Sequence, residues 1–205
     1  MRCRLRGMGD TESRVAWVRL ARDAAPGEWL LPELEAIREG GEARVVVLDA
    51  TGAEAVEAMG AEQLRALTLF ALPVVCCFEG EPGEGMADIA LAADIRVCGA
   101  GGALAVRPGA ERLDAEALLQ AGLVTAVAAA GEAAGEARRV AGVIASRGPI
   151  ATRLAKEAIK RGAGQPLEQA LRFETDLTLL LQTTKDRAEG VRAFLEKRPP
   201  LFTGE

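Results

Sequence analysis

Two segments of the sequence carry small residues and acids directly after a short apolar run. The run Val45–Leu48 leads into residues 49–62, and the run Val74–Phe78 leads into residues 79–88. Each pattern predicts a strand that passes through a loop into a helix, whose first N–H groups have no internal partner and attract negative charge. If the strands are neighbours in a parallel sheet, amides from both loops can stabilise a carbonyl oxygen that becomes an oxyanion. Glycines after a strand are also common in ordinary turns, so a purely structural role stays open.

The residue types that the chain lacks narrow this chemistry further. The 205 residues include no His and no Tyr. Imidazole bases and phenol acids are therefore excluded, and with them the His-dependent serine and cysteine hydrolases and the His-bearing zinc and iron sites. Any side chain that acts as an acid or a base must be Asp, Glu, Lys or Cys.

Composition and charge indicate a globular protein with enough apolar side chains to fill one sizeable core. Hydrophobic residues make up 49% and charged residues 27% of the chain, as is typical of such proteins. The net charge is −5, the cations are scattered and aromatic residues are only 3%, so we expect no nucleic-acid partner.

No long apolar stretch follows Arg2, Arg4 and Arg6, and we expect neither a secretory signal nor a membrane span.

The cysteines indicate a reducing compartment. None of the four stands in a CxxC spacing, and three lie inside apolar runs, where a buried thiol behaves as a small hydrophobic side chain: Cys3, Cys76, Cys77 and Cys98. We therefore expect a cytoplasmic protein whose cysteines form neither a disulfide nor a metal site.

The chain divides into two predicted parts, an α/β core over residues 1–127 and a helical region over residues 128–205. Four predicted strands in the first part alternate with helical patterns and favour parallel connections: residues 14–20, 45–48, 74–78 and 95–98. A short helix is predicted over residues 32–39, and Asp114 is a predicted N-cap of a helix that ends at Gly122. An extended segment over residues 123–127 follows, and three later helices are predicted around residues 150–162, from Pro166, and before Pro199.

Four blocks of the sequence, in the same order, resemble motifs of one protein family. Residues 72–96, Leu-Pro-Val-Val-Cys-Cys-Phe-Glu-Gly through Ala-Asp-Ile-Arg, resemble the motif KPVIAAVNGxAxGGGxELALACDIR of the enoyl-CoA hydratase/isomerase (crotonase) family. Residues 45–52 with 59–62 resemble its VVLTG…AGAD, residues 114–124 its SAEEALxxGLV, and residues 189–198 its EGVRAFLEKR. The resemblance implies a crotonase-like ββα spiral with a helical C-terminal region that builds homotrimers, often paired into hexamers.

The resemblance also implies roles for particular residues. The two oxyanion donors fall on the backbone N–H groups of Ala61 and Gly85, and Met59 and Gly60 belong to the same substrate-binding loop. Asp88 stands where hydratases place the first of two catalytic carboxylates, one helical turn after the donor glycine. It would position water or take a proton α to a thioester carbonyl. Alternatively, Asp88 only caps or charges the first turn of its helix.

Three departures from the family pattern concern the pocket. The run Leu104–Gly109, where the second carboxylate belongs, contains no acid, and Glu111 is the nearest candidate to replace it. The Gly-rich segment and the helix that normally follow are missing, and only residues 63–72 separate the first loop from the next strand. We therefore expect a more open pocket that excludes less water. The acids of the second loop, Glu79, Glu81 and Glu84, are expected to point to solvent.

Two hypotheses follow. In the first, the chain is a crotonase-type enzyme that acts on a thioester of coenzyme A or of a carrier protein, with no cofactor beyond the coenzyme A of the substrate. Phe194 and Lys197 would then help to hold the nucleotide end, although core packing and a solvated charge are the alternatives. In the second, the chain is a non-catalytic subunit or scaffold that assembles with a partner enzyme. The pairing of Ala61 with Gly85 favours the first hypothesis, and the missing second acid favours the second.

Overall fold

The computed structural model describes residues 12–20, 25–53, 57–107 and 109–205. The chain forms two compact units, residues 1–143 and residues 144–205, and each is described by itself. The division lies inside helix α5 (Ala133–Ala145), so most of this helix belongs to the first unit. The boundary predicted at residue 127 lies ahead of that helix. Cys3 and the three N-terminal arginines lie outside the described residues.

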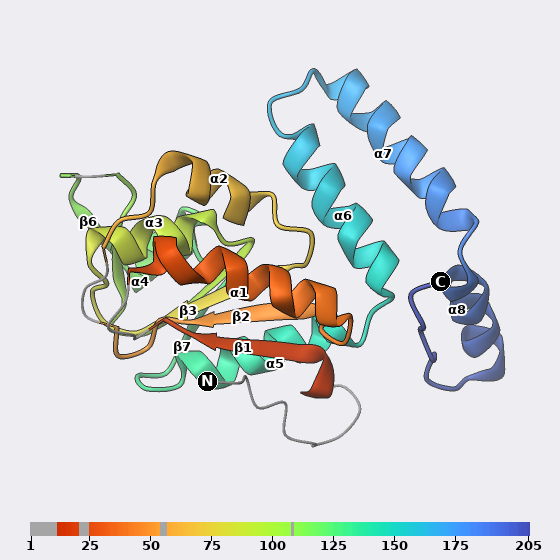
Figure 1. The fold of residues 1–205 in the computed structure, drawn as a ribbon, viewed down its shortest axis with the longest axis horizontal. Coiled ribbons are helices and arrows are strands. Elements are labelled where there is room, and N and C mark those ends of the chain that lie inside the picture. Colours follow the sequence, from red (N-terminus) through yellow and green to blue (C-terminus); the bar gives the residue numbers. More distant parts are fainter. Residues whose placement is uncertain (1–11, 21–24, 54–56, 108) are drawn as a thin grey trace. The chain divides into compact units, whose positions relative to one another are not determined.

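The first unit is built on a five-stranded parallel sheet with strand order β1-β2-β3-β4-β7 (Figure 1). Its strands are β1 (Val15–Arg19), β2 (Val45–Asp49), β3 (Val74–Phe78), β4 (Ile95–Gly99) and β7 (Ala126–Ala128). Every residue of β2 and of β3 is buried, which agrees with their continuous apolar sequences, because central parallel strands are covered on both faces. The predicted α/β class and the parallel connections are confirmed.

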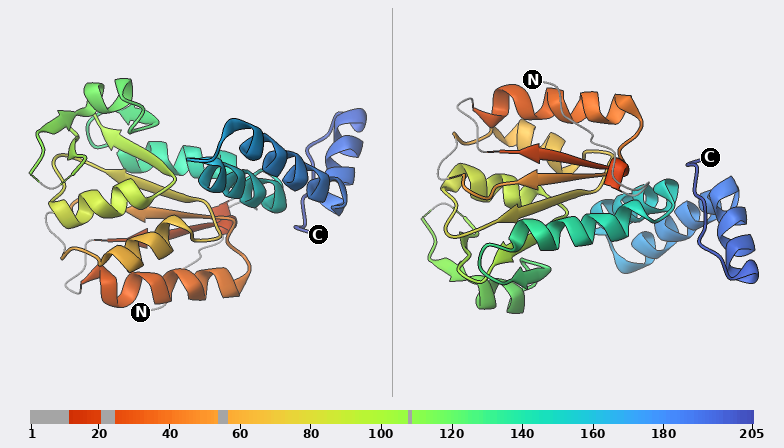
Figure 2. Two further views of the ribbon diagram at one scale, coloured as in Figure 1. Left: turned by 90° about the horizontal axis from the view of Figure 1, so that it is seen from above. Right: turned by 90° about the horizontal axis from the view of Figure 1, so that it is seen from below.

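Helices cover both faces of this sheet. Helices α1 (Pro26–Gly40), α2 (Ala61–Thr68) and α3 (Glu84–Ala92) lie on one face, and α5 crosses the other (Figures 1 and 2). The core on the first face contains the alternate residues of the strands, such as Val46, Leu48, Cys76 and Phe78. On α5, Ala133, Ala137 and Ala141 are fully buried at a spacing of one turn, as expected for a helix with one apolar side.

Two elements differ from the sequence prediction. Helix α1 begins at Pro26 rather than at residue 32, and Pro32 lies inside it. Either proline could stand in the first turn of a helix. Leu30 and Leu34 are fully buried and lie four residues apart, so the apolar side of the helix begins before Pro32. The extended segment predicted over residues 123–127 is displaced as well. Leu123 and Val124 instead form the turn after α4, with both N–H groups bonded to Leu118 O, and the strand begins at Ala126.

A small hairpin and a short helix complete the first unit. Strands β5 (Ala103–Ala105) and β6 (Arg112–Asp114) pair in antiparallel fashion, and helix α4 (Ala115–Gln120) follows β6 directly. The Asp114 side chain accepts the N–H of Ala117 at 2.8 Å, which confirms the predicted N-cap. The N–H of Ala103 donates to Gly80 O at 2.9 Å and ties the hairpin to the loop after β3.

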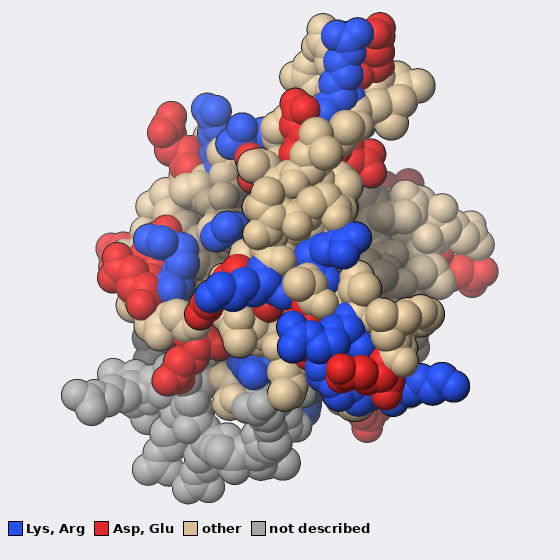
Figure 3. Space-filling model, turned by 90° about the vertical axis from the view of Figure 1, so that its right-hand side faces the viewer, with Lys and Arg blue, Asp and Glu red and all other residues tan. Residues whose placement is uncertain are grey.

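The second unit contains three helices, α6 (Pro149–Gly162), α7 (Leu167–Gln182) and α8 (Lys185–Glu196). Helices α6 and α7 pack against each other. Acidic and basic side chains are interspersed with neutral ones on the face shown in Figure 3. Within the described ranges, no helix combines the length and the apolar character that crossing a membrane requires.

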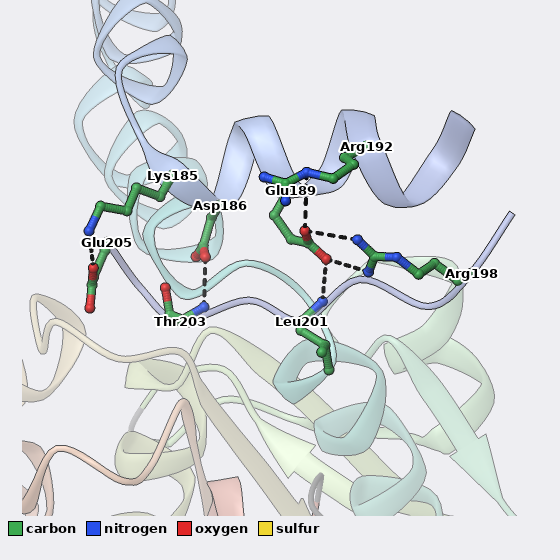
Figure 4. A pocket seen from close by; sticks show the side chains of 8 residues that line it. All are labelled: Lys185, Asp186, Glu189, Arg192, Arg198, Leu201, Thr203 and Glu205. Carbon is green, nitrogen blue, oxygen red and sulfur yellow. Dashed lines mark hydrogen bonds and ion pairs between the residues drawn. The ribbon is translucent and has the colours of Figure 1, made fainter. Parts of the chain in front are cut away.

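Residues 201–205 fold back along α8, and the two segments together line an open pocket of about 420 Å³ (Figure 4). The Glu189 carboxylate accepts hydrogen bonds from Arg198 Nη1 at 2.6 Å and from the N–H of Leu201 at 3.0 Å. The buried Asp186 carboxylate accepts from the N–H groups of Thr203 and Gly204, at 2.7 and 3.0 Å. The charged groups that line this pocket therefore act mainly to dock the segment.

The docking of this segment is expected to weaken at low pH. Hydrogen bonds from Arg198 and from the Leu201 N–H lower the pKa of Glu189 from the ordinary value of 4.5 to about 2. Because the folded pKa is the lower one, the stabilisation is complete above pH 4.5 and is lost as the pH falls toward 2. Carboxyl NMR of Glu189 and amide exchange at Leu201 measure this, and in Glu189→Gln that part of the pH dependence of exchange should vanish. Titration of Glu189 at its ordinary value would contradict the prediction.

Candidate active site

The two loops that could stabilise an oxyanion follow neighbouring strands. Strands β2 and β3 pair in parallel, with Val46 opposite Val74 and Asp49 opposite Cys77, so their carboxyl ends lie side by side. Helices α2 and α3 contact each other, and both begin on the side of the sheet to which the arrowheads point (Figure 1). The two strands are therefore neighbours in a parallel sheet, which is the condition for amides of both loops to reach one oxygen.

Ala61 is the first residue of α2. Gly60 is the N-cap in an extended conformation, with φ −64° and ψ 156°, and its carbonyl accepts the N–H of Leu64 at 3.0 Å. Among the described residues, no acceptor is found for the N–H of Ala61, and the residue is exposed. This is the state of a first-turn amide that can bind an external oxygen.

Gly85 is the second residue of α3 and is buried. The carbonyl of the N-cap, Gly83, accepts the N–H groups of Met86 and Ala87 at 3.0 and 2.9 Å. The N–H of Gly85 has no acceptor within the described parts of the chain. At its other end, α3 is held by Arg96, whose Nη1 donates to Ala93 O at 2.7 Å.

Asp88 lies three residues after Gly85 on α3, in its second turn, and its side chain is half-buried. No hydrogen bond or ion pair to another described residue is found for its carboxylate. The alternative in which Asp88 caps the helix is wrong, because the N-cap is Gly83 and the acid of the first turn is Glu84. Beyond the other end of α3, Asp94 has a structural role, since its Oδ2 accepts the N–H of Val74 at 2.8 Å.

The expectation that Glu79 points to solvent is wrong. Its side chain is half-buried, and Oε1 accepts the N–H of Ala133 at the start of α5, at 2.9 Å. The side chain occupies the place that a Cβ atom at Gly99 would need. Glu81 and Glu84 are exposed as predicted, and Glu81 forms an ion pair with Arg112 at 2.5 Å.

Two polar side chains that support the first loop were not identified from the sequence. Asp49, buried at the end of β2, accepts hydrogen bonds from Trp17 Nε1 at 3.0 Å and from the N–H of Thr51 at 3.0 Å. Gln63 accepts the N–H of Gly60 at 2.9 Å. A Gln three residues after an N-cap is half of a capping-box pattern, and that signal was available in the sequence.

The cysteines of the sheet do not take part in proton transfer. Burial raises the pKa of Cys76 to about 12 and also raises the pKa of Cys77 and of Cys98. These thiols stay protonated at neutral pH, which removes them from the set of acids and bases. Among the described residues, no group of three or more Cys, Asp or Glu side chains could hold a metal ion.

The hairpin of β5 and β6, where the resemblance predicts a second acid, contains two acids among its described residues, Glu111 and Asp114. Asp114 is used as the N-cap of α4, and Glu111 is exposed ahead of β6. Replacement of the second acid by Glu111 stays a prediction. The side chain of Met59 is buried in the core, at 5% exposure, and the neighbouring Gly60 is exposed.

The residues predicted to hold the nucleotide end lie in the second unit. The side chain of Phe194 is 83% exposed, so the alternative of core packing is wrong for it within this chain. Lys197 is an exposed residue at the end of α8 in a left-handed conformation, with φ 54°. Their part in a nucleotide site stays a prediction.

Comparison with known proteins identifies the family. The model of the enoyl-CoA hydratase/isomerase family matches residues 102–205. The chain is 33% identical over 162 residues to a probable mitochondrial enoyl-CoA hydratase 2 of Arabidopsis thaliana, a match that covers 65% of this chain and 54% of that protein. It is 28% identical over 169 residues to a short-chain-enoyl-CoA hydratase of Clostridium acetobutylicum, covering 68% of this chain and 65% of that protein.

Solved structures share the fold. The crystal structure of an enoyl-CoA hydratase from Bacillus anthracis superposes with a TM-score of 0.81 at 27% identity, covering 94% of this chain and 96% of that chain. The predicted crotonase-like fold is confirmed by this likeness. The chain thus spans about half to two thirds of the length of the two relatives named above, and it belongs to the enoyl-CoA hydratase/isomerase family.

Proposed function

We propose that this chain acts on acyl thioesters of coenzyme A and stabilises a thioester enolate with the N–H groups of Ala61 and Gly85. The observation that carries the proposal is a pair of first-turn amides without internal acceptors, at the ends of two adjacent parallel strands. The carboxylate of Asp88 lies one helical turn from the second amide. The similarity to enoyl-CoA hydratases supports the choice of an acyl-CoA substrate.

In the proposed mechanism, the thioester oxygen accepts hydrogen bonds from both amides. Asp88 removes a proton from the carbon α to the carbonyl, and the electron pair of the C–H bond becomes the enolate that the amides stabilise. The protonated Asp88 then returns the proton, at the same or at another carbon. A single carboxylate suits such proton transfer, in isomerisation or after decarboxylation, better than the addition of water by two acids.

A panel of purified thioesters tests this function. Crotonyl-CoA, a β,γ-unsaturated acyl-CoA and a malonyl-type CoA distinguish hydration, isomerisation and decarboxylation, and the same acyl groups on a carrier protein test the other thioester class. We expect turnover of at least one CoA thioester, with isomerisation or decarboxylation faster than hydration. The absence of turnover on every thioester would contradict the proposal.

A second candidate function is that of a non-catalytic subunit. It is favoured because the acids of the hairpin are Glu111, which is exposed, and Asp114, which caps α4. The two candidates differ in the thioester panel. A scaffold would turn over no thioester, although it could still bind coenzyme A and gain thermal stability from it.

We also propose that the chain assembles as a homotrimer, or as a hexamer of two trimers. Large apolar side chains of α7 and α8 are more than half exposed in the single chain, which is unusual for a surface without a partner: Leu167, Leu171, Leu179, Leu180, Phe194 and Leu195. Sedimentation equilibrium should give three or six times the chain mass of 21.5 kDa. A monomer at micromolar concentration would contradict this assembly.

A further inference from the structure

The side chain of Gln63 joins two parts of the first unit that are far apart in the sequence. Its Oε1 accepts the N–H of Gly60 at 2.9 Å, and its Nε2 donates to Gly27 O at 2.8 Å. Gly60 is the residue before Ala61, and Gly27 lies in the first turn of α1. Because only the amide oxygen can accept and only the amide nitrogen can donate, the two bonds fix the orientation of the side chain.

Helix α1 has space for the Gln63 amide because residue 27 is a glycine. A Cβ atom at Gly27 would lie 2.9 Å from Gln63 Oε1 and 3.0 Å from Nε2, closer than packing allows. A side chain at this position would therefore displace the Gln63 amide, although Ala has the higher helix propensity. By contrast, a Cβ at Gly40, near the other end of the same helix, would meet no atom within 4 Å.

These bonds control the direction of the Ala61 N–H. The carbonyl of Gly60 and the N–H of Ala61 belong to one planar trans peptide and point in opposite directions. The carbonyl accepts Leu64 N–H inside the helix, so the Ala61 N–H points out of the helix end. Gln63 holds the preceding peptide through the N–H of Gly60, and rotation at Gly60 is restricted from both sides.

We infer that Gln63 is a positioning residue for the Ala61 amide, with α1 as its anchor through Gly27. This inference rests on the proposed function, in which the Ala61 N–H stabilises the oxyanion. A misplacement of about 1 Å can cost about 100-fold in rate. A donor that binds the transition state more strongly than the substrate affects kcat more than KM.

Three variants separate positioning from simple stability. Gln63→Met keeps the size of the side chain and removes both hydrogen bonds, and Gln63→Glu keeps the acceptor for the Gly60 N–H but loses the donor to Gly27. Gly27→Ala leaves Gln63 itself unchanged and displaces its side-chain amide by adding a Cβ atom on α1. The matched controls are Gly40→Ala and Gln120→Met. Gln120 lies on the exposed surface of α4, where its side chain donates to Glu116 at 3.2 Å.

The first readout is independent of any substrate. Amide NMR and hydrogen exchange of Gly60 and Ala61 should change in Gln63→Met and in Gly27→Ala, with the Gly60 amide exchanging faster, and should stay unchanged in both controls. Unchanged amides in Gln63→Met would overturn the inference, whatever the function of the chain.

The second readout uses cinnamoyl-CoA, whose absorption moves to longer wavelength when its carbonyl accepts hydrogen bonds. We expect this shift in the wild type, a smaller shift in Gln63→Met and Gly27→Ala, and an intermediate one in Gln63→Glu. On the best substrate of the thioester panel, kcat should fall at least tenfold in Gln63→Met while KM changes less than threefold. Altered amides with an unchanged spectrum and kcat would overturn the inference. A wild type that neither shifts the spectrum nor turns over any thioester would instead overturn the proposed function, and the inference with it.

Discussion

Asp88→Asn is expected to lower kcat by about 100- to 10,000-fold, the usual contribution of a positioned acid or base. The asparagine keeps the size of the side chain but cannot accept the proton from the α carbon. Because the Asp88 carboxylate has no partner among the described residues, its loss should change the free energy of unfolding little. Steady-state kinetics and thermal unfolding of the same preparations measure the two effects.

Matched variants show whether the effect belongs to Asp88. Glu84→Gln removes an exposed acid from the first turn of the same helix and should leave kcat nearly unchanged. Asp88→Glu keeps a carboxylate at the position and should retain most of the activity. If Asp88→Asn is as active as the wild type, Asp88 is not the base and the proposed mechanism is wrong.

Ala61→Pro is expected to lower kcat by about 100- to 1,000-fold, the effect of removing one oxyanion donor. Proline has no N–H, and the first position of a helix is the one where it is favoured. Gly60 already has the extended conformation that precedes proline, with φ −64° and ψ 156°. The substitution therefore deletes the amide hydrogen with little change in the stability of α2.

The control for this substitution is Ala61→Ser, which keeps the N–H and adds only a small exposed side chain. It should retain a kcat within a few fold of the wild type. Circular dichroism and thermal unfolding of both variants show whether α2 is intact. If Ala61→Pro folds normally and keeps full activity, the N–H of Ala61 stabilises no oxyanion.

The sequence predicted the sheet well because its central strands are continuous apolar runs. The bounds of β3 agree with the prediction, and β2 and β4 each extend one residue further. The predicted start of α1 was wrong because Pro26 and Pro32 both indicate the first turn of a helix. Only the burial of the helix against the sheet selects Pro26. Local patterns thus identified the elements, and tertiary packing set their ends.

The site was only partly predictable for the same reason. The positions of Ala61, Gly85 and Asp88 follow from motifs and helix spacing. The supporting contacts join residues that no local pattern connects, because Gln63 bonds Gly27 across 36 positions, Glu79 bonds Ala133 across 54, and Asp49 bonds Trp17 across 32. Such hydrogen bonds depend on the order of strands and helices in space.

A crystal structure with butyryl-CoA, a saturated thioester that offers no double bond to hydrate, shows directly whether the two amides bind a thioester oxygen. The measurement is the distance from the thioester oxygen to the two backbone nitrogens. We expect the oxygen to lie about 2.7 to 3.1 Å from the nitrogens of both Ala61 and Gly85, with the α carbon facing Asp88. A thioester oxygen that contacts neither nitrogen, with the acyl group bound elsewhere, would show that these amides form no oxyanion hole.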